Sequence, residues 1–485
     1  MLEKAELTLI NMLSKTKEVI TTPPPVLCSV ASCKLFYSTV YRVGTLSLLF
    51  VPPAEGGGME INMKEYSILL EETPLTEKMI EGVLDRIIEQ IDDVEKILLV
   101  PPDITRCYSG GGQITAYLYW KLSKRTEVFI MPAVGTHRAM TRDEQKNFFD
   151  PAIPEEAFLY HDWKSDTVKL GTIPETFCES VSNGKYVKEI SVETDRRLLD
   201  KSFDLILSIG QVVPHEVVGM ANYTKNILVG LGGRGMINES HMMGAVCNLE
   251  TIMGEINTPV RKVFDYAEEE FLSQIPIVYI LTVACEEHGN SAIYGIFTGD
   301  SRRVFEQAAA LATKKNITFV SKPVKKVVAW LEPKEFTSFW VGNKAIYRTR
   351  MIIEDGGELL IIAPGVKTFG ENSEVDALIR KYGYNGTPYT MDLVRQGIFK
   401  GMEMVAAHMI HSSSEGRFTI TYAVNPQNMT KEEIESVGWS FMDASEALLK
   451  YPLDQMKEGY NKMKDGEEVY MVKAPALGVW KILPS

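Results

Sequence analysis

Cysteine is scarce in this sequence, and the cysteines that occur are not paired in short motifs. Six of them are spread over 485 residues, and no Cys-x-x-Cys pair is found among them. A disulfide scaffold or a zinc knuckle requires closely spaced cysteines. The sequence therefore excludes both kinds of small cross-linked domain, and we expect reduced thiols in a cytoplasmic protein.

An excess of positive charge and a long apolar run are also missing. The formal net charge is −13 and the pI is near 5.3, whereas proteins that bind nucleic acid gather Lys and Arg into a dominant patch. The apolar run from Val40 to Val51 is interrupted by Arg42 and Gly44 and is shorter than the roughly 20 residues of a membrane-spanning helix. Charged residues within Met1 to Lys17 predict a short amphipathic helix there instead of a secretory signal. We expect neither a nucleic-acid partner nor a membrane span.

Strand-like and helix-like segments alternate along the chain. Short runs of β-branched and apolar residues predict strands at 96–100, 127–131, 203–209, 277–283, 327–330 and 358–363. Amphipathic stretches predict helices at 77–92, 258–272, 300–315 and 373–382. This alternation is typical of α/β proteins, in which helices flank largely parallel sheets. We predict two lobes with the active site in the cleft between them: an N-terminal lobe at 1–272, a C-terminal lobe at 273–440, and a final segment at 441–485 that can return to the first lobe.

Polar residues follow the first of these strands. Asp103 and Arg106 come directly after the apolar run Ile97 to Val100, so they fall at the carboxyl edge of the predicted sheet, where open α/β sheets bind ligands. The guanidinium of Arg106 could hold a substrate carboxylate through two hydrogen bonds. An ion pair between Asp103 and Arg106 that braces the loop is an equally good interpretation.

Histidines and glycines concentrate in turn-like segments. Four of the seven histidines lie there, namely His137, His161, His215 and His241. Each could be an ordinary surface histidine. Glycines between Gly210 and Gly233 let the backbone approach a bound group closely, although a tight connection between elements explains them as well. Lys344 begins a helical stretch, where a solvated lysine is the default interpretation.

Taken in order, these residues resemble the nickel-pincer lactate racemase family. The similarity covers about residues 95–445 and rests on Asp103-x-Thr-Arg106, Gly135-Thr-His137-Arg138, His161-Asp-Trp163, Val213-Pro-His215, Lys225, His241, Gly299-Asp300, Lys344 and Gly356-Gly357. The separations of ten residues from His215 to Lys225 and of twenty-six from His215 to His241 look like those of the family.

The resemblance implies a cofactor and a role for each residue. The cofactor would be a nickel-pincer nucleotide, pyridinium-3-thioamide-5-thiocarboxylic acid mononucleotide with nickel. It would be tethered covalently to Lys225, and His241 would complete a square-planar nickel site, a geometry that suits Ni(II). Asp103, Gly232 and Gly233 would contact the cofactor, and Arg106 and Lys344 would hold the substrate carboxylate. His137 and His215 would exchange the hydroxyl proton on opposite sides of the substrate while a hydride leaves and returns to the neighbouring carbon.

Departures from the family pattern bear on the substrate. The Ser-Gly-Gly run usual before the anchoring lysine is replaced by Ala221-Asn222-Tyr223-Thr224, the proline usual after Arg106 is Cys107, and an expected glutamine is Val341. We therefore expect a racemase or epimerase acting on a 2-hydroxy acid other than lactate, preferably a polyhydroxylated sugar acid. The enzymes of cofactor biosynthesis would be its partners, and a homodimer is compatible with the sequence.

Two other functions remain open at this point. The histidines His137, His215 and His241 could bind an ordinary catalytic metal such as zinc in an isomerase or hydrolase. Alternatively, the glycine-rich loops could hold an anionic metabolite in a protein without catalytic activity.

Overall fold

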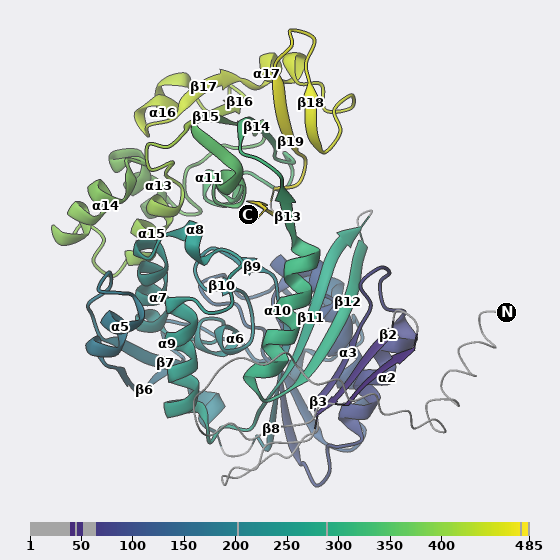
Figure 1. The fold of residues 1–485 in the computed structure, drawn as a ribbon. Coiled ribbons are helices and arrows are strands. Elements are labelled where there is room, and N and C mark those ends of the chain that lie inside the picture. Colours follow the sequence, from purple (N-terminus) through teal and green to yellow (C-terminus); the bar gives the residue numbers. More distant parts are fainter. Residues whose placement is uncertain are drawn as a thin grey trace, which may run out of the picture.

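The computed structural model describes residues 65–200, 203–287, 290–475 and 478–483, together with the backbone of two strands at 39–43 and 46–51. Figure 1 shows two large sheets, one in the lower and one in the upper part of the view, each flanked by helices. The expected α/β architecture with helices flanking the sheets is therefore confirmed. The helix expected at Met1 to Lys17 lies outside the described residues.

The first sheet has eight strands and is mixed. Its order is β1 (Thr39–Val43), β2 (Leu46–Val51), β3 (Glu65–Leu69), β12 (Asn290–Gly299), β11 (Ile277–Glu287), β8 (Leu205–Gln211), β4 (Lys96–Val100) and β5 (Glu127–Ile130). The strands β11, β8, β4 and β5 run parallel, and the strands from β1 to β12 run antiparallel to their neighbours. Because β4, β5 and β8 are neighbours and parallel, the loops that leave their carboxyl ends meet at one edge of the sheet.

Helices cover this sheet because each presents an apolar face to it. The helix α2 (Glu77–Ile88) begins with a Thr76 cap and buries Val83, Leu84 and Ile87. With α3 (Gly111–Leu122) it encloses a compact apolar cluster against β4 and β8. The helix α10 (Arg302–Asn316) packs on β11 and β12. Burial of these faces contributes most of the driving force for folding of this half.

The second sheet has six strands and is parallel except at one edge. Its order is β17 (Ser440–Asp443), β16 (Thr419–Val424), β15 (Ile353–Ile362), β14 (Val324–Trp330), β19 (Glu468–Val472) and β18 (Gly459–Lys462), with β18 antiparallel to β19. The helices α11 (Phe339–Gly342), α12 (Lys344–Thr349), α13 (Ser373–Tyr382), α14 (Gly386–Arg395), α15 (Glu403–His411), α16 (Lys431–Ser436) and α17 (Ala444–Lys450) belong to this half.

Shorter elements complete the fold. Two-stranded sheets are formed by β6 (Thr167–Ile173) with β7 (Ile190–Asp195), by β9 (Pro214–His215) with β10 (Gly219–Met220), and by β13 (Ile317–Val320) with β20 (Val479–Ile482). The remaining helices of the first half are α4 (Arg142–Phe148), α5 (Glu175–Val181), α6 (Thr224–Leu228), α7 (Arg234–Val246), α8 (Leu249–Ile252) and α9 (Pro259–Ala267). Short helical turns occur at η1 (Ile104–Ser109), η2 (Glu155–Ala157), η3 (Arg196–Leu199), η4 (Glu268–Leu272) and η5 (Arg350–Ile352). Among the described residues, none of the helices is long and apolar enough to cross a bilayer.

The chain passes from the first sheet to the second later than the boundary between the lobes that was expected at residue 273. The strands β11 and β12 belong to the first sheet, because the apolar strand that starts at Ile277 pairs in parallel with β8. The second sheet starts only at Val324. Of the final segment expected at 441–485, β18 and β19 stay with the second sheet, whereas Lys481 of β20 forms an ion pair with Glu255 of the first half at 2.7 Å.

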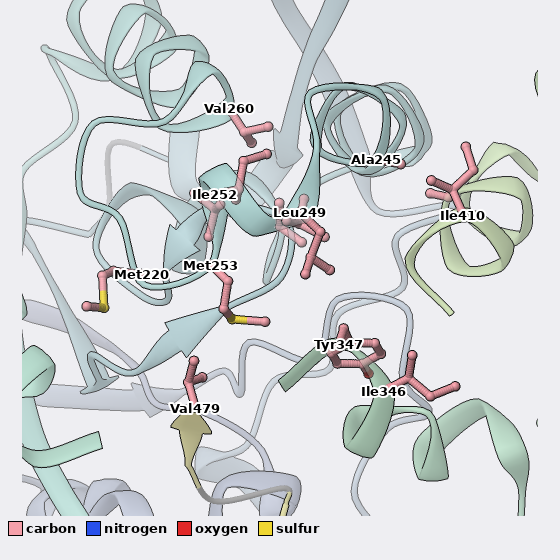
Figure 2. Packing of buried hydrophobic residues seen from close by; sticks show 14 of the residues in the cluster. Met220, Ala245, Leu249, Ile252, Met253, Val260, Ile346, Tyr347, Ile410 and Val479 are labelled. Carbon is pink, nitrogen blue, oxygen red and sulfur yellow. The ribbon is translucent and has the colours of Figure 1, made fainter. Parts of the chain in front are cut away.

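The two halves share one apolar cluster. Figure 2 shows Ile346 and Tyr347 of α12 and Val479 of β20 near Leu249 and Met253 of the first half. Between the halves, α15 packs along α7. Because this contact is apolar and buried, side chains of α12 and α15 are held close to the loops that follow the parallel strands.

Candidate active site

The loops after three neighbouring parallel strands carry most of the residues singled out in the sequence. The chain leaves β4 through Pro101 and Pro102 into η1, which is capped by Asp103 and contains Arg106. The loop after β5 carries His137, and the β9–β10 hairpin after β8 carries His215. The loops are tied together directly, because the Gly135 amide donates to the Gly230 carbonyl at 2.8 Å. Residues that are far apart in the sequence thus meet at one edge of the sheet.

His137 is oriented by Asp103. Its Nδ1 lies 2.7 Å from Asp103 Oδ2, and the other carboxylate oxygen of Asp103 accepts from the Thr105 hydroxyl at 2.5 Å. Although burial raises the pKa of Asp103, the hydrogen bonds from His137 and Thr105 bring it below its usual value. An ionised carboxylate can only accept, so Nδ1 of His137 donates to it, and in the neutral form of the ring the lone pair is on Nε2. With 56% of its side chain exposed, His137 is placed to accept a proton from a ligand.

His215 lies deeper and has a different partner. Its Nδ1 accepts a hydrogen bond from the Val217 amide at 3.1 Å, and only 9% of its side chain is exposed. Burial lowers the pKa of His215 well below its usual range, and the positive charges of Lys225 and Arg106 lower it further. The neutral ring with an acceptor at Nδ1 carries its proton on Nε2.

Lys225 lies in α6 with a half-buried side chain. Burial lowers the pKa of its amine to about 8, and the positive charge of Arg106 adds to this effect, while Glu216 and Asp103 oppose it. A lysine in such surroundings is a far better nucleophile at neutral pH than a solvated one, because more of it is unprotonated.

Chemical labelling of Lys225 should reveal its low pKa. The amine is mostly protonated and unreactive below a pH of about 8 and becomes reactive above it. At pH 7 roughly a tenth of the Lys225 amine is neutral, whereas fewer than about one in a thousand free lysine side chains are neutral. We expect acetic anhydride to acetylate Lys225 with a half-maximal rate near pH 8, as measured by peptide mass spectrometry. Surface lysines in the same digest serve as the control, and a midpoint for Lys225 above about pH 10 would contradict the assignment.

The turn before Lys225 is strained. Asn222 and Tyr223 have φ angles of 63° and 57°, and ψ of Tyr223 is −135°. Residues other than glycine rarely adopt this combination of backbone angles. Both residues belong to the segment Ala221-Asn222-Tyr223-Thr224, which stands where the family pattern described above has a Ser-Gly-Gly run. The backbone therefore keeps a conformation that glycine would adopt without cost.

Buried polar groups hold this strained turn. The fully buried Arg261 of α9 donates to the carbonyl oxygens of Met220 and Asn222 at 2.7 and 3.2 Å and to the Thr224 hydroxyl at 2.6 Å. In addition, the Tyr223 hydroxyl donates to Glu268 at 2.8 Å. These hydrogen bonds fix the residues on both sides of the turn and so position Lys225.

Two tyrosines that bind the same carboxylate allow a test of this positioning. Tyr223 and Tyr279 each donate to Glu268 at 2.8 Å, so Tyr223→Phe and Tyr279→Phe should each lower the free energy of unfolding by about 1–3 kcal/mol in urea titrations. Only Tyr223 belongs to the strained turn. We therefore expect Tyr223→Phe alone to slow the acetylation of Lys225 at pH 8, and equal rates in the two variants would refute the positioning role.

His241 is the second residue with the properties of a ligand. It lies on α7, and its Nδ1 donates to the Ile237 carbonyl oxygen at 2.6 Å. Burial lowers its pKa to about 4, so the ring is neutral and its Nε2 lone pair is free. An imidazole fixed through Nδ1 to a carbonyl is the usual arrangement of a histidine that binds a metal through Nε2.

Further cations reach the site from the second half. Lys344 begins α12, and burial together with Arg106 and Arg348 lowers its pKa to about 8, so the expectation of a solvated lysine is wrong. One turn later, the buried Arg348 donates to the Gly478 carbonyl at 3.1 Å. No acceptor among the described residues contacts its buried Nε. Arg106 acts electrostatically on both Lys344 and Arg348, so cations of both halves face one region.

Glu216 and Arg348 are residues that the sequence analysis missed. Burial raises the pKa of Glu216, but electrostatic interactions with His215 and Arg348 hold this pKa well below its usual range. Glu216 follows a residue already singled out, and Arg348 lies four residues after Lys344, which is one helical turn. That spacing was the only available signal for Arg348.

The two glycines expected to bind the cofactor are explained by packing within the protein. A Cβ on Gly232 would lie 1.9 Å from the Leu228 carbonyl oxygen, and one on Gly233 would lie 2.2 Å from the Glu193 carboxylate. His161 is fully buried, with Nδ1 2.7 Å from Asp195 and Nε2 3.3 Å from the Gly232 carbonyl oxygen. His161 and both glycines thus stabilise the loop that leads into α7.

The histidines do not form a conventional metal site. No group of three or more His, Cys, Asp or Glu side chains in the described ranges is arranged to hold a metal ion. The alternative in which His137, His215 and His241 together bind zinc is therefore not supported by their placement.

Comparisons with known proteins agree with the fold. Residues 60–253 match the family model of the lactate racemase N-terminal domain. A protein from Thermotoga maritima superimposes with a TM-score of 0.71 at 24% identity, covering 85% of this chain and 100% of its own. The lactate racemase apoprotein from Thermoanaerobacterium thermosaccharolyticum superimposes with a TM-score of 0.59 at 16% identity, covering 85% and 91%. None of the curated proteins matches this chain.

Proposed function

We propose that this chain inverts a hydroxyl-bearing carbon of a 2-hydroxy acid, because residues 60–253 match the family model of the lactate racemase N-terminal domain and the fold is similar to that of a lactate racemase apoprotein. The reaction would use a nickel-pincer nucleotide bound covalently to Lys225. The preferred substrates are sugar acids, and the enzymes of cofactor biosynthesis would be partners in the cytoplasm.

The observation that carries this proposal is the chemistry of Lys225 and His241. Lys225 offers an amine with a pKa of about 8. His241 offers an Nε2 lone pair, because burial, and to a smaller extent the charge of Lys225, lower its pKa. The reactive amine of Lys225 can form a covalent tether, and the imidazole nitrogen of His241 is a suitable ligand for nickel. The residues present therefore fit the cofactor, which would supply a reversible hydride acceptor.

The other residues would bind the substrate and move its proton. Arg106 and Lys344 would hold the carboxylate from opposite halves of the molecule, which fixes the reacting carbon while it is planar. His137 would accept the hydroxyl proton on Nε2, with Asp103 stabilising the resulting imidazolium. His215 would face the opposite side, and conversion of the Lys225 amine into an uncharged thioamide would remove one of the cations that lower its pKa.

The fate of deuterium on the reacting carbon tests the proposal. The protein would be co-produced with the enzymes that make the cofactor and incubated in ordinary water with a sugar acid, D-gluconate, deuterated at C2. We expect inversion at C2 with the deuterium retained, because a hydride that leaves and returns does not exchange with solvent. Chiral chromatography with mass detection measures both quantities, and protein produced without the cofactor enzymes is the control.

Other results would favour other functions. Inversion with loss of deuterium would indicate removal of the C2 proton by a base and would contradict the hydride route. Binding of the acid without inversion, in protein that carries the cofactor mass, would support a metabolite-binding protein.

A further inference from the structure

The two histidines proposed to face the substrate differ in what their Nδ1 atoms contact. Nδ1 of His137 lies 2.7 Å from a carboxylate oxygen of Asp103. Nδ1 of His215 accepts from the Val217 amide at 3.1 Å, and its nearest carboxylate oxygen, on Glu216, is 3.7 Å away. The structure thus contains two histidine–carboxylate pairs. The pair of His137 and Asp103 is hydrogen-bonded, whereas the pair of His215 and Glu216 is too far apart for a hydrogen bond.

This difference decides which ring can act as a base. His137 carries its proton on Nδ1 and presents a lone pair on Nε2. His215, in the arrangement seen, carries its proton on Nε2 and cannot accept another there. In the two-base route each histidine accepts the hydroxyl proton of one antipode on Nε2 and returns a proton to the other antipode, so His215 must change its tautomer before it can act as a base.

Glu216 has the properties needed to bring about that change. It remains ionised beside Arg348 and His215, and among the described residues its carboxylate accepts a hydrogen bond only from its own backbone amide, so one oxygen is available to His215. Its side chain is 22% exposed, which leaves it room to move. A shift of roughly 1 Å would bring its oxygen within hydrogen-bond distance of Nδ1.

We propose that Glu216 is the positioning residue of His215, as Asp103 is of His137. When Nδ1 turns from the Val217 amide to the Glu216 carboxylate, the proton of His215 resides on Nδ1 and the lone pair on Nε2 faces the substrate. The proposal rests on the proposed function, because it assigns Glu216 to the second of the two proton-transfer groups.

Charges of both halves act on this pair. Lys225 and Arg106 act on His215, and Arg348 acts on Glu216. All of these groups favour the ionised form of Glu216 or the neutral form of His215. A neutral ring beside an ionised carboxylate is the combination in which the carboxylate selects the tautomer.

Nitrogen-15 NMR of histidine-labelled protein tests the proposal without cofactor. Spectra of His215, assigned with His215→Gln, report which ring nitrogen carries the proton and give its pKa by titration. In Glu216→Gln we expect the population with the proton on Nδ1 to fall and the pKa of His215 to drop, because a carboxylate that raises it is lost. The matched control is Glu335→Gln, which removes an exposed carboxylate that acts on Lys344 but not on His215.

Kinetics of the cofactor-loaded enzyme provide the second readout. We expect Glu216→Gln to lower kcat for inversion about 10- to 100-fold with little change in KM, and Glu216→Asp to restore part of the loss. Glu335→Gln should leave kcat unchanged. These effects differ from those of a substrate contact, which would appear mainly in KM.

Two results would overturn the proposal. An unchanged tautomer and pKa of His215 in Glu216→Gln would show that the carboxylate does not orient the ring, whatever the enzyme's substrate. A changed KM with an unchanged kcat would make Glu216 a substrate-binding residue. Because the NMR result is obtained on protein without cofactor, it stands even if the hydride mechanism fails.

Discussion

Replacing Lys225 by alanine should abolish covalent attachment of the cofactor. The amine is the only atom group of this residue that can form the tether, and its low pKa makes it reactive at neutral pH. Intact mass of protein co-produced with the cofactor enzymes should show an adduct on the natural chain and none on Lys225→Ala. Nickel, measured by elemental analysis, should fall from near one per chain to background in the variant, since His241 alone binds it weakly.

The matched control for this experiment is Lys344→Ala. Lys344 is also a half-buried lysine whose pKa burial lowers to about 8, so its loss changes the charge of the site to the same extent. The adduct and the nickel should remain in Lys344→Ala, whereas KM for the hydroxy acid should rise. An adduct of undiminished mass in Lys225→Ala would remove Lys225 from its proposed role.

Replacing His137 by glutamine should lower kcat for inversion by a factor of about 10² to 10⁴, the contribution typical of a general base. His137 is the histidine that presents an Nε2 lone pair, because Asp103 binds its Nδ1 at 2.7 Å. Its side chain is largely exposed, so the variant should fold normally and keep the cofactor adduct. Chiral chromatography of initial rates measures the effect, and intact mass measures the loading.

Arg138→Gln is the control for His137. Arg138 is the next residue in the loop, is exposed and pairs with Glu144, so its replacement disturbs the same loop without touching a proton-transfer group. We expect nearly natural rates in Arg138→Gln. Full activity in His137→Gln would show that the hydroxyl proton takes another route.

The elements with strong periodicity could be predicted from the sequence. The helix Ser373–Tyr382 has the expected bounds, and Lys96–Val100 has those of the expected strand. Both depend on neighbours along the chain, namely an Asn372 cap and an uninterrupted apolar run. By contrast, the expected start of a new lobe at Ile277 missed the pairing of that strand with β8, because strand order is set by contacts between distant segments.

The candidate site was only partly visible in the same way. His137, His215 and Lys225 stand out because loop histidines and a glycine-rich segment are unusual in local sequence. His241 stood out for the same reason, but it lies within the helix α7 and not in the turn expected there. Arg261 and Glu268 lie in an ordinary amphipathic stretch, and nothing in that stretch indicates that they hold the turn before Lys225. Their role arises from packing of α9 beneath that turn.

By itself, the sequence determined the alternation of strands and helices, the residues that can do chemistry, and their order along the chain, because these follow from side-chain type and periodicity. Tertiary structure alone decided the protonation of those residues. The pKa of Lys225, the free Nε2 of His241 and the different tautomers of His137 and His215 depend on burial and on partners such as Asp103 and Ile237. Desolvation and hydrogen bonding act over a few ångströms in space, and the sequence does not state which residues come that close.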